Sequence, residues 1–181
     1  MAKNVGKIFE TQWKNSAPTY ALIYRLPDAA TSFGSNTNIR FSRKNPFDYL
    51  MFDSRNRLLY ALELKSVSGK SISFERSKED HGVIHYWQIE GLAEWNQFDG
   101  VIGGFVIEFR DVEQTIFIDI ESFKELTQII PKKSFTLHDL DTYGITFYPI
   151  IQTKRRTRFS YDIDLFLQQQ AVIYGGKDNG E

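Results

Sequence analysis

Two acidic positions and one lysine lie in neighbouring apolar runs, where charged side chains are unusual. Asp48 lies in the run PFDYLMF, and Glu63, Leu64 and Lys65 end the apolar run that begins at Leu58. Burying an unpaired charge is costly, so charges in such segments need a reason. An aspartate, then a glutamate and a lysine two residues apart, is the set that a magnesium-dependent phosphodiesterase uses, because Mg²⁺ prefers hard oxygen ligands and activates a bound water. The pattern predicts catalytic residues Asp48, Glu63 and Lys65, with Asp48, Glu63 and the Leu64 carbonyl as ligands of Mg²⁺, or of Mn²⁺ in its place.

Two further polar residues are candidates for the same site. Gln88 lies four residues after Ile84 and four before Leu92, on the inward face of a helix expected over residues 83–96. A buried glutamine needs hydrogen-bond partners, and a metal-bound water or a phosphate would supply one; a local bond at the margin of the apolar stripe is the alternative. Glu10, on the first helix, is either an ordinary solvated charge or an additional catalytic carboxylate.

The spacing predicts how the acidic residues come together. Residues 46–53 and 57–66 read as two strands joined by the turn sequence DSRN. A hairpin around residues 54 and 55 pairs 50 with 59 and 48 with 61. Asp48 then lies diagonal to Glu63 on one face, with about 7–8 Å between their Cα atoms. An odd-length turn or a bulge would reverse the faces, and a solvent-exposed Glu–Lys pair remains the alternative for this common motif.

The remaining elements predict an α/β protein with a mixed central sheet. Helices are expected over residues 5–15, 83–96, 121–130 and 161–170, with a helical turn over 136–141. Further strands are expected over residues 20–25, 100–109, 115–120 and, less regularly, 143–151. Residues 100–109 are almost continuously apolar, which is typical of a strand buried on both faces. We expect one domain over residues 1–170, with a long loop over 29–45 and a disordered tail over 171–181.

Composition limits the cellular location and the kinds of partner that can be expected. The 181 residues include no cysteine, which excludes disulfides and thiolate metal sites and fits a cytoplasmic location. Apolar runs stay below the roughly 18 residues of a membrane span, so no membrane association is expected. The net charge of −1 does not by itself indicate nucleic acid, so any DNA contact must come from local basic clusters.

Taken in order, Asp48, Glu63-Leu64-Lys65 and Gln88 resemble the core of the PD-(D/E)xK nuclease superfamily. Within it, the chain is similar to the RecU-type Holliday junction resolvases. The likeness includes the segments GKIFE at residues 6–10, SF at 73–74, HYWQIE at 85–90 and RFSYD at 158–162. It implies a restriction-endonuclease-like fold, with a mixed central β-sheet flanked by helices.

The resemblance also implies an activity and a partner. Such a protein is a homodimer that cuts four-way DNA junctions with Mg²⁺ during recombination and repair. The catalytic roles would fall on Asp48, Glu63, Lys65 and Gln88. Phe47 replaces the family's small hydroxyl residue, the segment before Asp48 is shorter than the family's projecting stalk, and residues 65–88 form a longer stretch. A restriction- or repair-type nuclease on duplex DNA and a non-catalytic DNA-binding accessory protein therefore stay open as alternatives.

Three basic clusters could contact DNA phosphates, since each neutralised phosphate adds to affinity. The first flanks Asp48 and is the best candidate, the second lies between Lys65 and Gln88, and the third is the dense run KRRTR at residues 154–158. For each, a solvated face is the ordinary interpretation. The predicted DNA-binding residues, from the first two clusters, are Arg40, Arg43, Lys44, Lys70, Arg76 and Lys78.

Overall fold

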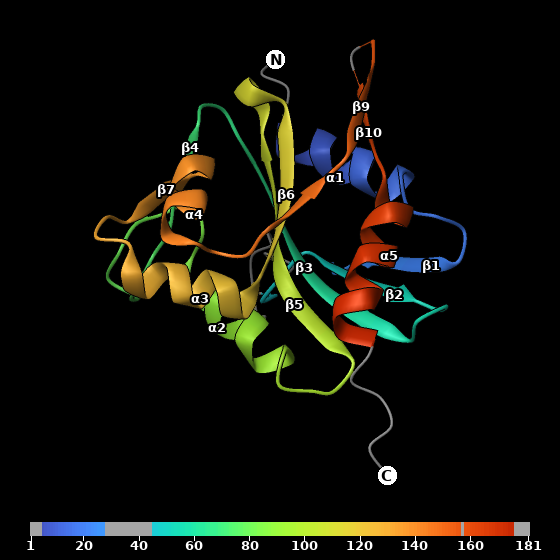
Figure 1. Cartoon of the computed structure of the whole chain (residues 1–181), viewed down its shortest axis with the longest axis horizontal. Helices are drawn as coiled ribbons and strands as arrows, with labels where there is room; N and C mark the ends of the chain where they lie inside the picture. The colour runs from blue at the N-terminus through green and yellow to red at the C-terminus, as the bar shows by residue number, and fades with distance from the viewer. Residues whose placement is uncertain (1–4, 28–44, 157, 176–181) are drawn as a thin grey trace, which may run out of the picture.

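A six-stranded sheet forms the centre of the protein in the computed structural model, which describes residues 5–27, 45–156 and 158–175 (Figure 1). The strand order across the sheet is β1-β2-β3-β5-β6-β8. Its strands are β1 (Ala21–Arg25), β2 (Tyr49–Asp53), β3 (Leu58–Val67), β5 (Val101–Phe109), β6 (Gln114–Asp119) and β8 (Tyr148–Ile150). All neighbours are antiparallel except β3 and β5, which run parallel. The predicted mixed sheet is therefore confirmed.

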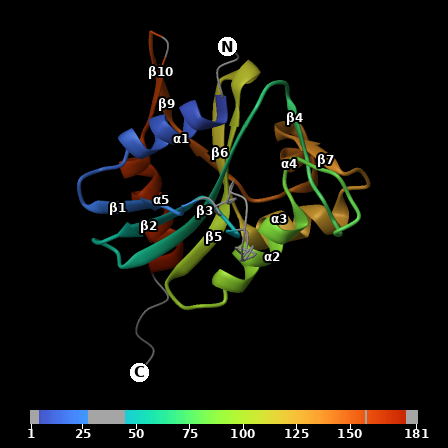
Figure 2. The same cartoon turned by 180° about the vertical axis from the view of Figure 1, so that it is seen from behind.

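Helices cover both faces of this sheet (Figures 1 and 2). They are α1 (Val5–Asn15), α2 (Tyr86–Trp95), α3 (Ile120–Ile129), α4 (Leu137–Tyr143) and α5 (Ile163–Tyr174), with a short 3-10 turn η1 (Arg110–Val112) between β5 and β6. Helices α1 and α5 pack on one face, and α2, α3 and α4 lie on the side of the other. The architecture is α/β, and in its general shape it is consistent with a restriction-endonuclease-like fold, as predicted.

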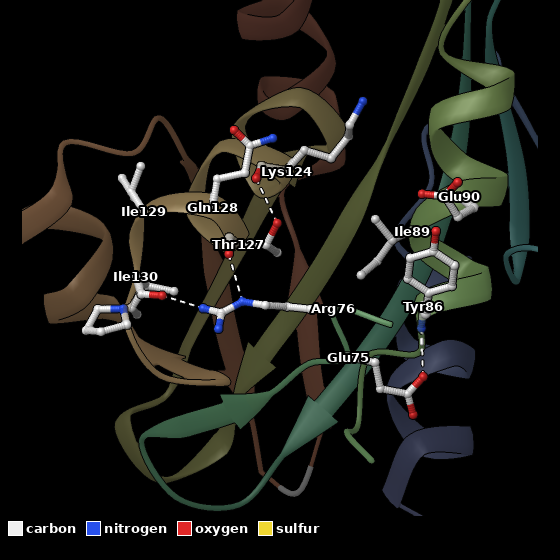
Figure 3. Close-up of a pocket in the computed structure, with 11 residues that line it drawn as sticks. Glu75, Arg76, Tyr86, Ile89, Glu90, Lys124, Thr127, Gln128, Ile129 and Ile130 are labelled. Atoms are coloured by element: carbon white, nitrogen blue, oxygen red, sulfur yellow. Dashed lines mark hydrogen bonds between the residues drawn. The ribbon is translucent and has the colours of Figure 1, made fainter. Parts of the chain in front are cut away.

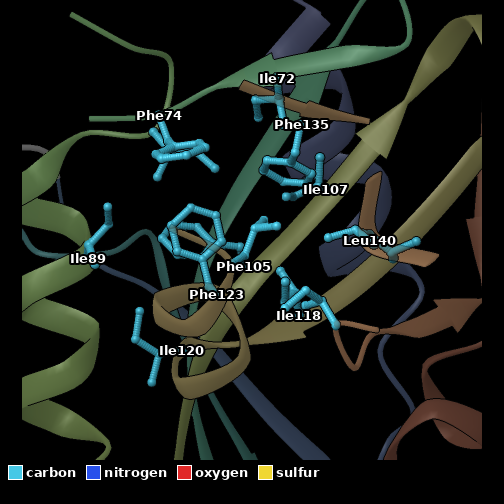
Figure 4. Close-up of a cluster of buried hydrophobic side chains, with 14 of the residues drawn as sticks. Ile72, Phe74, Ile89, Phe105, Ile107, Ile118, Ile120, Phe123, Phe135 and Leu140 are labelled. Atoms are coloured by element: carbon cyan, nitrogen blue, oxygen red, sulfur yellow. The ribbon is translucent and has the colours of Figure 1, made fainter. Parts of the chain in front are cut away.

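Strand β5 separates the two halves of the core because its side chains alternate between the faces. Phe105 and Ile107 join the cluster beneath α2 and α3, where Phe105 and Phe123 have ring centroids 4.6 Å apart (Figure 4). Val106 joins the cluster beneath α1 and α5. The expectation of a strand buried on both faces is confirmed, and this rigid centre fixes the neighbouring β3.

Two small antiparallel pairs lie outside the main sheet. They are β4 (Ser71–Ser73) with β7 (Ser134–Thr136), and β9 (Gln152–Arg155) with β10 (Arg158–Tyr161). The sequence analysis missed these strands, because each has only three or four residues and most of them are polar. Strand β4 pairs with β7, which is distant in sequence, and the β9–β10 ribbon carries little apolar pattern.

Two helix boundaries differ from the prediction by three residues or more, and the others by two at most. Helix α2 begins at Tyr86 rather than 83, because the N–H groups of Val83 and Ile84 donate to the Ser73 carbonyl and Ile84 bridges Phe74. Helix α5 continues to Tyr174, past the expected start of the tail at 171, because Gln170 is still on its buried face. Residues 176–181 of the predicted tail, and residues 28–44 of the predicted 29–45 loop, lie outside the described residues.

Within the residues that the structure describes, no helix is long and apolar enough to cross a membrane.

Candidate active site

The hairpin of β2 and β3 brings Asp48 next to Glu63, but in a register different from the predicted one. Tyr49 pairs with Leu62 and Leu50 with Ala61, and the ladder ends there; the N–H of Asp48, just before β2, donates to the Leu62 carbonyl. The predicted register was wrong by two residues, since Leu50 pairs with Ala61 rather than with Leu59. An even shift leaves the faces of the paired residues unchanged. Asp48, beyond the end of the ladder, lies near enough to Glu63 for its charge to raise the pKa of Glu63.

The cause of the shift is a wider turn. Asp53 pairs with Leu58, which leaves four residues in the loop rather than two. The Asp53 carboxylate accepts hydrogen bonds from the backbone N–H groups of Arg55 (3.0 Å) and Asn56 (3.4 Å), and Arg57 takes a left-handed φ of 56°. An aspartate that caps its own turn in this way favours the longer loop.

Glu63 is the centre of the site. Its side chain is buried, with only 3% of the residue exposed. The Lys65 ammonium lies 2.9 Å from Oε1 of Glu63, and the Nε2 amide of Gln88 donates to the same oxygen. Lys65 on β3 and Gln88 on α2 thus both contact Oε1 of the Glu63 carboxylate, from two sides. The predicted inward position of Gln88 is confirmed.

The burial of Glu63 makes its carboxyl group hard to ionise. The pKa of Glu63 is raised from an ordinary 4.5 to about 7; burial is the largest cause and the negative charge of Asp48 adds to it, while Lys65 and the Gln88 amide act in the opposite direction. A cation placed between the two carboxylates would favour their ionised forms. Glu63 is therefore a buried acid poised near neutral pH, as is common at functional sites.

Asp48 lies just before β2 and is fixed by the backbone of β3. Its Oδ2 atom accepts a hydrogen bond of 3.1 Å from the N–H of Leu64, and its own N–H donates to the Leu62 carbonyl. Burial raises the pKa of Asp48; the Leu64 N–H and Lys65 lower it, and the charge of Glu10 raises it. The side chain of Leu64 packs in the core on the far face, while its carbonyl stays a predicted metal ligand.

Glu10 is close enough to affect this site, although it comes from a different element. Its Oε2 atom is 2.7 Å from Nε of Arg25 on β1, and its side chain is 19% exposed. Because Glu10 is paired and influences Asp48, it is not an ordinary solvated helix charge. Arg25, which the sequence analysis did not single out, links α1 to the strand next to Asp48.

A second residue that the sequence analysis missed, Glu75, anchors the helix that carries Gln88. Its carboxylate accepts a hydrogen bond of 2.8 Å from the N–H of Tyr86 (Figure 3). It also accepts one of 3.2 Å from the N–H of Gly82 and lies 2.8 Å from Nδ1 of His85. Burial favours the neutral form, but these donors outweigh it and lower the pKa of Glu75. The Gln88 side chain in turn accepts from the His85 N–H at 3.0 Å, so its amide is held at both ends.

The predicted DNA-binding residues have different surroundings. Lys70 and Lys78 are exposed. The Arg76 guanidinium donates to the backbone carbonyls of Thr127 (2.9 Å) and Ile130 (Figure 3) and to that of Lys132, in and just beyond α3. Arg76 thus has a structural role, and its phosphate contact stays a prediction. The predicted residues Arg40, Arg43 and Lys44 lie outside the described residues.

The residues that could hold a metal ion are few. Within residues 5–27, 45–156 and 158–175, no group of three or more His, Cys, Asp or Glu side chains is arranged to hold one. Mg²⁺ keeps several waters and needs only one or two carboxylates. Asp48 and Glu63 supply that hard-oxygen pair, and their mutual repulsion is what a divalent cation would relieve. The donor set therefore fits Mg²⁺.

A cavity of about 640 Å³ between α2 and α3 lies apart from this cluster (Figure 3). Glu75, Arg76, Tyr86 and Lys124 contribute to its lining, whereas Asp48, Glu63 and Lys65 do not. Glu75, which anchors α2, lines this cavity, but none of the predicted catalytic residues does. The cavity is therefore not part of the candidate active site.

Comparison with known proteins gives one similar relative. No family model matches the chain. The SPbeta prophage-derived uncharacterized protein YotM of Bacillus subtilis (strain 168) is 33% identical over 137 residues, which is 73% of this chain and 64% of that protein. The chain thus matches less than two thirds of the length of this relative.

Proposed function

We propose that this protein is a Mg²⁺-dependent endonuclease that cuts branched DNA, with the four-way junction as its substrate. The observation that carries the proposal is the environment of Glu63: Lys65 and Gln88, from two elements, bind one of its oxygens, and Asp48 lies near enough for its charge to act on Glu63. These are the four positions to which the RecU-type resemblance assigns catalysis. That resemblance supports branched DNA as the substrate and a homodimer as the active form, and the absence of cysteine suits a reducing cytoplasm.

In this proposal Asp48 and Glu63, with the carbonyl of Leu64, hold the metal ion. When bound, Mg²⁺ polarises the phosphate and lowers the pKa of a coordinated water. Lys65 favours the ionised form of the Glu63 carboxylate and presents a positive charge where negative charge grows during hydrolysis. Gln88 fixes the orientation of Glu63 through its amide, and the N–H of Leu64 fixes Asp48.

Cleavage of a synthetic four-way junction with Mg²⁺ tests the proposal. Replacement of Asp48 by Asn or of Glu63 by Gln is expected to reduce the cleavage rate by about 100-fold or more, as for other electrostatic catalytic groups, with junction binding retained. The matched control is Glu94→Gln, an exposed position on α2, which is expected to cut like the wild type.

Two outcomes would contradict different parts of this proposal. A wild-type protein that binds junctions but never cuts them with Mg²⁺ or Mn²⁺ would exclude the enzyme and leave a DNA-binding accessory protein. Equal cutting of linear duplex and junction would remove the junction specificity and leave a nuclease of the restriction or repair type.

A further inference from the structure

The β9–β10 ribbon carries a dense cluster of basic side chains and projects from the body of the protein beside α1 (Figures 1 and 2). Arg158 pairs with Arg155, and Phe159 with Lys154, so the two strands run antiparallel up to the tip. Lys154, Arg155, Arg156 and Arg158 are all exposed. The ribbon is therefore a narrow, strongly positive projection on a chain whose net charge is −1.

The two faces of the ribbon differ, because paired residues of a two-stranded ribbon share a face. One face of the ribbon is turned toward the body and carries Gln152, Lys154, Phe159 and Tyr161. Tyr161 is buried, and Lys154 pairs with Glu113, which immediately precedes β6. The opposite face carries Arg155 and Arg158 directly across from each other, with Thr153 and Ser160 behind them. Guanidinium and hydroxyl groups are the donors that contact phosphate oxygens.

The arginines of the outer face have no structural explanation. In the described part of the chain, no acidic side chain forms an ion pair with Arg155, Arg156 or Arg158. Like charges directly opposite each other destabilise a pair of strands. Arg156 in addition holds a left-handed φ of 55°, which is unfavourable for a non-glycine residue. A polyanion bound to this face would offset the repulsion between the arginines, because each guanidinium would then lie next to a negative charge.

The root of the ribbon is rigid and connected to the candidate active site. The Tyr161 hydroxyl donates to Glu108 at 2.9 Å, its N–H donates to the Ser16 hydroxyl at 3.0 Å, and its ring lies edge-on to Phe9 at 5.5 Å. Phe9 is the neighbour of Glu10, the α1 residue that pairs with Arg25 and acts on Asp48. One helix thus supports both the ribbon and the edge of the acidic site.

From this geometry we infer that the β9–β10 ribbon is a second DNA-contacting element, which grips the phosphates of a duplex arm outside the acidic site. The inference rests on the proposed function for its choice of DNA as the polyanion. A two-stranded β-ribbon is narrow enough to enter the major groove of B-DNA, about 12 Å wide, or to lie along its phosphates. The ribbon would position the arm, and Asp48 and Glu63 would remain the site of cleavage.

The salt dependence of DNA binding tests this inference. Binding of a fluorescent four-way junction and of a linear duplex is measured by anisotropy without divalent cations, so that no cleavage is needed. The variant replaces Arg155, Arg156 and Arg158 by Gln. Each neutralised phosphate contributes about 0.9 to the slope of log K against log salt, so the slope should fall by about 2.7. When the salt concentration rises from about 50 to 200 mM, the affinity of the variant should therefore fall by a factor about 40 times smaller than the factor for the wild type.

Two matched variants separate the role of the ribbon from general charge and from misfolding. Substitution of the same three arginines by Lys keeps the charge and should keep the slope. Substitution of Arg55, Arg57 and Lys124 by Gln removes three positive charges outside the ribbon and should leave the slope of log K against log salt unchanged. The single change Arg156→Gln at the exposed tip, which should lower the slope by about 0.9, serves if the triple variant does not fold.

The results distinguish this inference from the proposed function. A triple Gln variant with the slope of the wild type, or a control variant that loses as much, would overturn the ribbon contact even if the enzyme cuts junctions. A wild type that never cuts, but whose binding weakens as predicted, would overturn the nuclease and leave the ribbon contact. In a cutting enzyme, the triple variant should raise KM and leave kcat unchanged.

Discussion

The buried carboxyl group of Glu63 should make the stability of the protein depend on pH in a way that one substitution removes. The pKa of Glu63 is raised from 4.5 to about 7 by burial, with Asp48 adding to the effect and Lys65 opposing it. Below pH 4.5 both the folded and the unfolded chain carry the proton. As the pH rises toward 7, the unfolded chain loses this proton first, so the free energy of unfolding falls, and it levels off above 7.

The magnitude follows from the difference between the two pKa values, 7 − 4.5 = 2.5. Each pH unit of that difference is worth about 1.4 kcal/mol, so Glu63 should lower the free energy of unfolding by about 3 kcal/mol between pH 4.5 and 8. Glu63→Gln mimics the protonated acid at all pH values. The free energy of unfolding of the variant, relative to the wild type, should therefore rise by about 3 kcal/mol over this range.

Urea denaturation of both proteins at several pH values between 4.5 and 8, without divalent cations, measures this difference. Glu94→Gln is the control for loss of an exposed carboxylate and should follow the wild type. A relative change of less than about 1 kcal/mol would refute the claim that Glu63 is buried and hard to ionise. Addition of Mg²⁺ should stabilise the wild type more at pH 8 than at pH 6, because the ion binds the ionised carboxylate.

Three further substitutions test the supports of the site. Lys65→Met removes the main group that lowers the pKa of Glu63, so this pKa should rise further, as measured by carbon NMR of labelled glutamate; an unchanged value would contradict the 2.9 Å ion pair. Glu75→Gln weakens the carboxylate that receives three donors at the start of α2 and should destabilise the protein by about 1–3 kcal/mol in urea denaturation; no loss would mean that the anchor is dispensable. Gly91→Ala would place a Cβ 2.1 Å from Cβ of Pro46, so it should lower stability by about 1–3 kcal/mol and slow junction cleavage, and a variant with wild-type stability and rate would refute this close packing.

Much of the fold follows from local patterns in the sequence. The bounds of α1 and the doubly buried β5 agree closely with the apolar periodicity, because both bury a regular stripe or run. The short strands β4, β7, β9 and β10 could not be found in this way. Their residues are mostly polar, and their pairing depends on contacts that the chain makes only after folding.

The register of the β2–β3 hairpin shows the limit of such reasoning at the site. The prediction that Asp48 and Glu63 come together agrees with the structure, in which the charge of Asp48 acts on Glu63. The predicted register was wrong by two residues, because Asp53 caps a wider turn than the dipeptide pattern indicated. Turn length depends on a few hydrogen bonds rather than on the apolar pattern of the strands.

The sequence by itself determined the kinds of groups available: two carboxylates and a lysine in apolar strands, and a glutamine on an inward helix face. These follow from residue identity and from the periods of strands and helices. Only the tertiary structure decided that Lys65 and Gln88 meet on one oxygen of Glu63, that Glu75 anchors α2, and that Arg76 is engaged by α3. Those contacts join elements far apart in the chain, and burial, which only the folded chain provides, gives Glu63 its altered pKa.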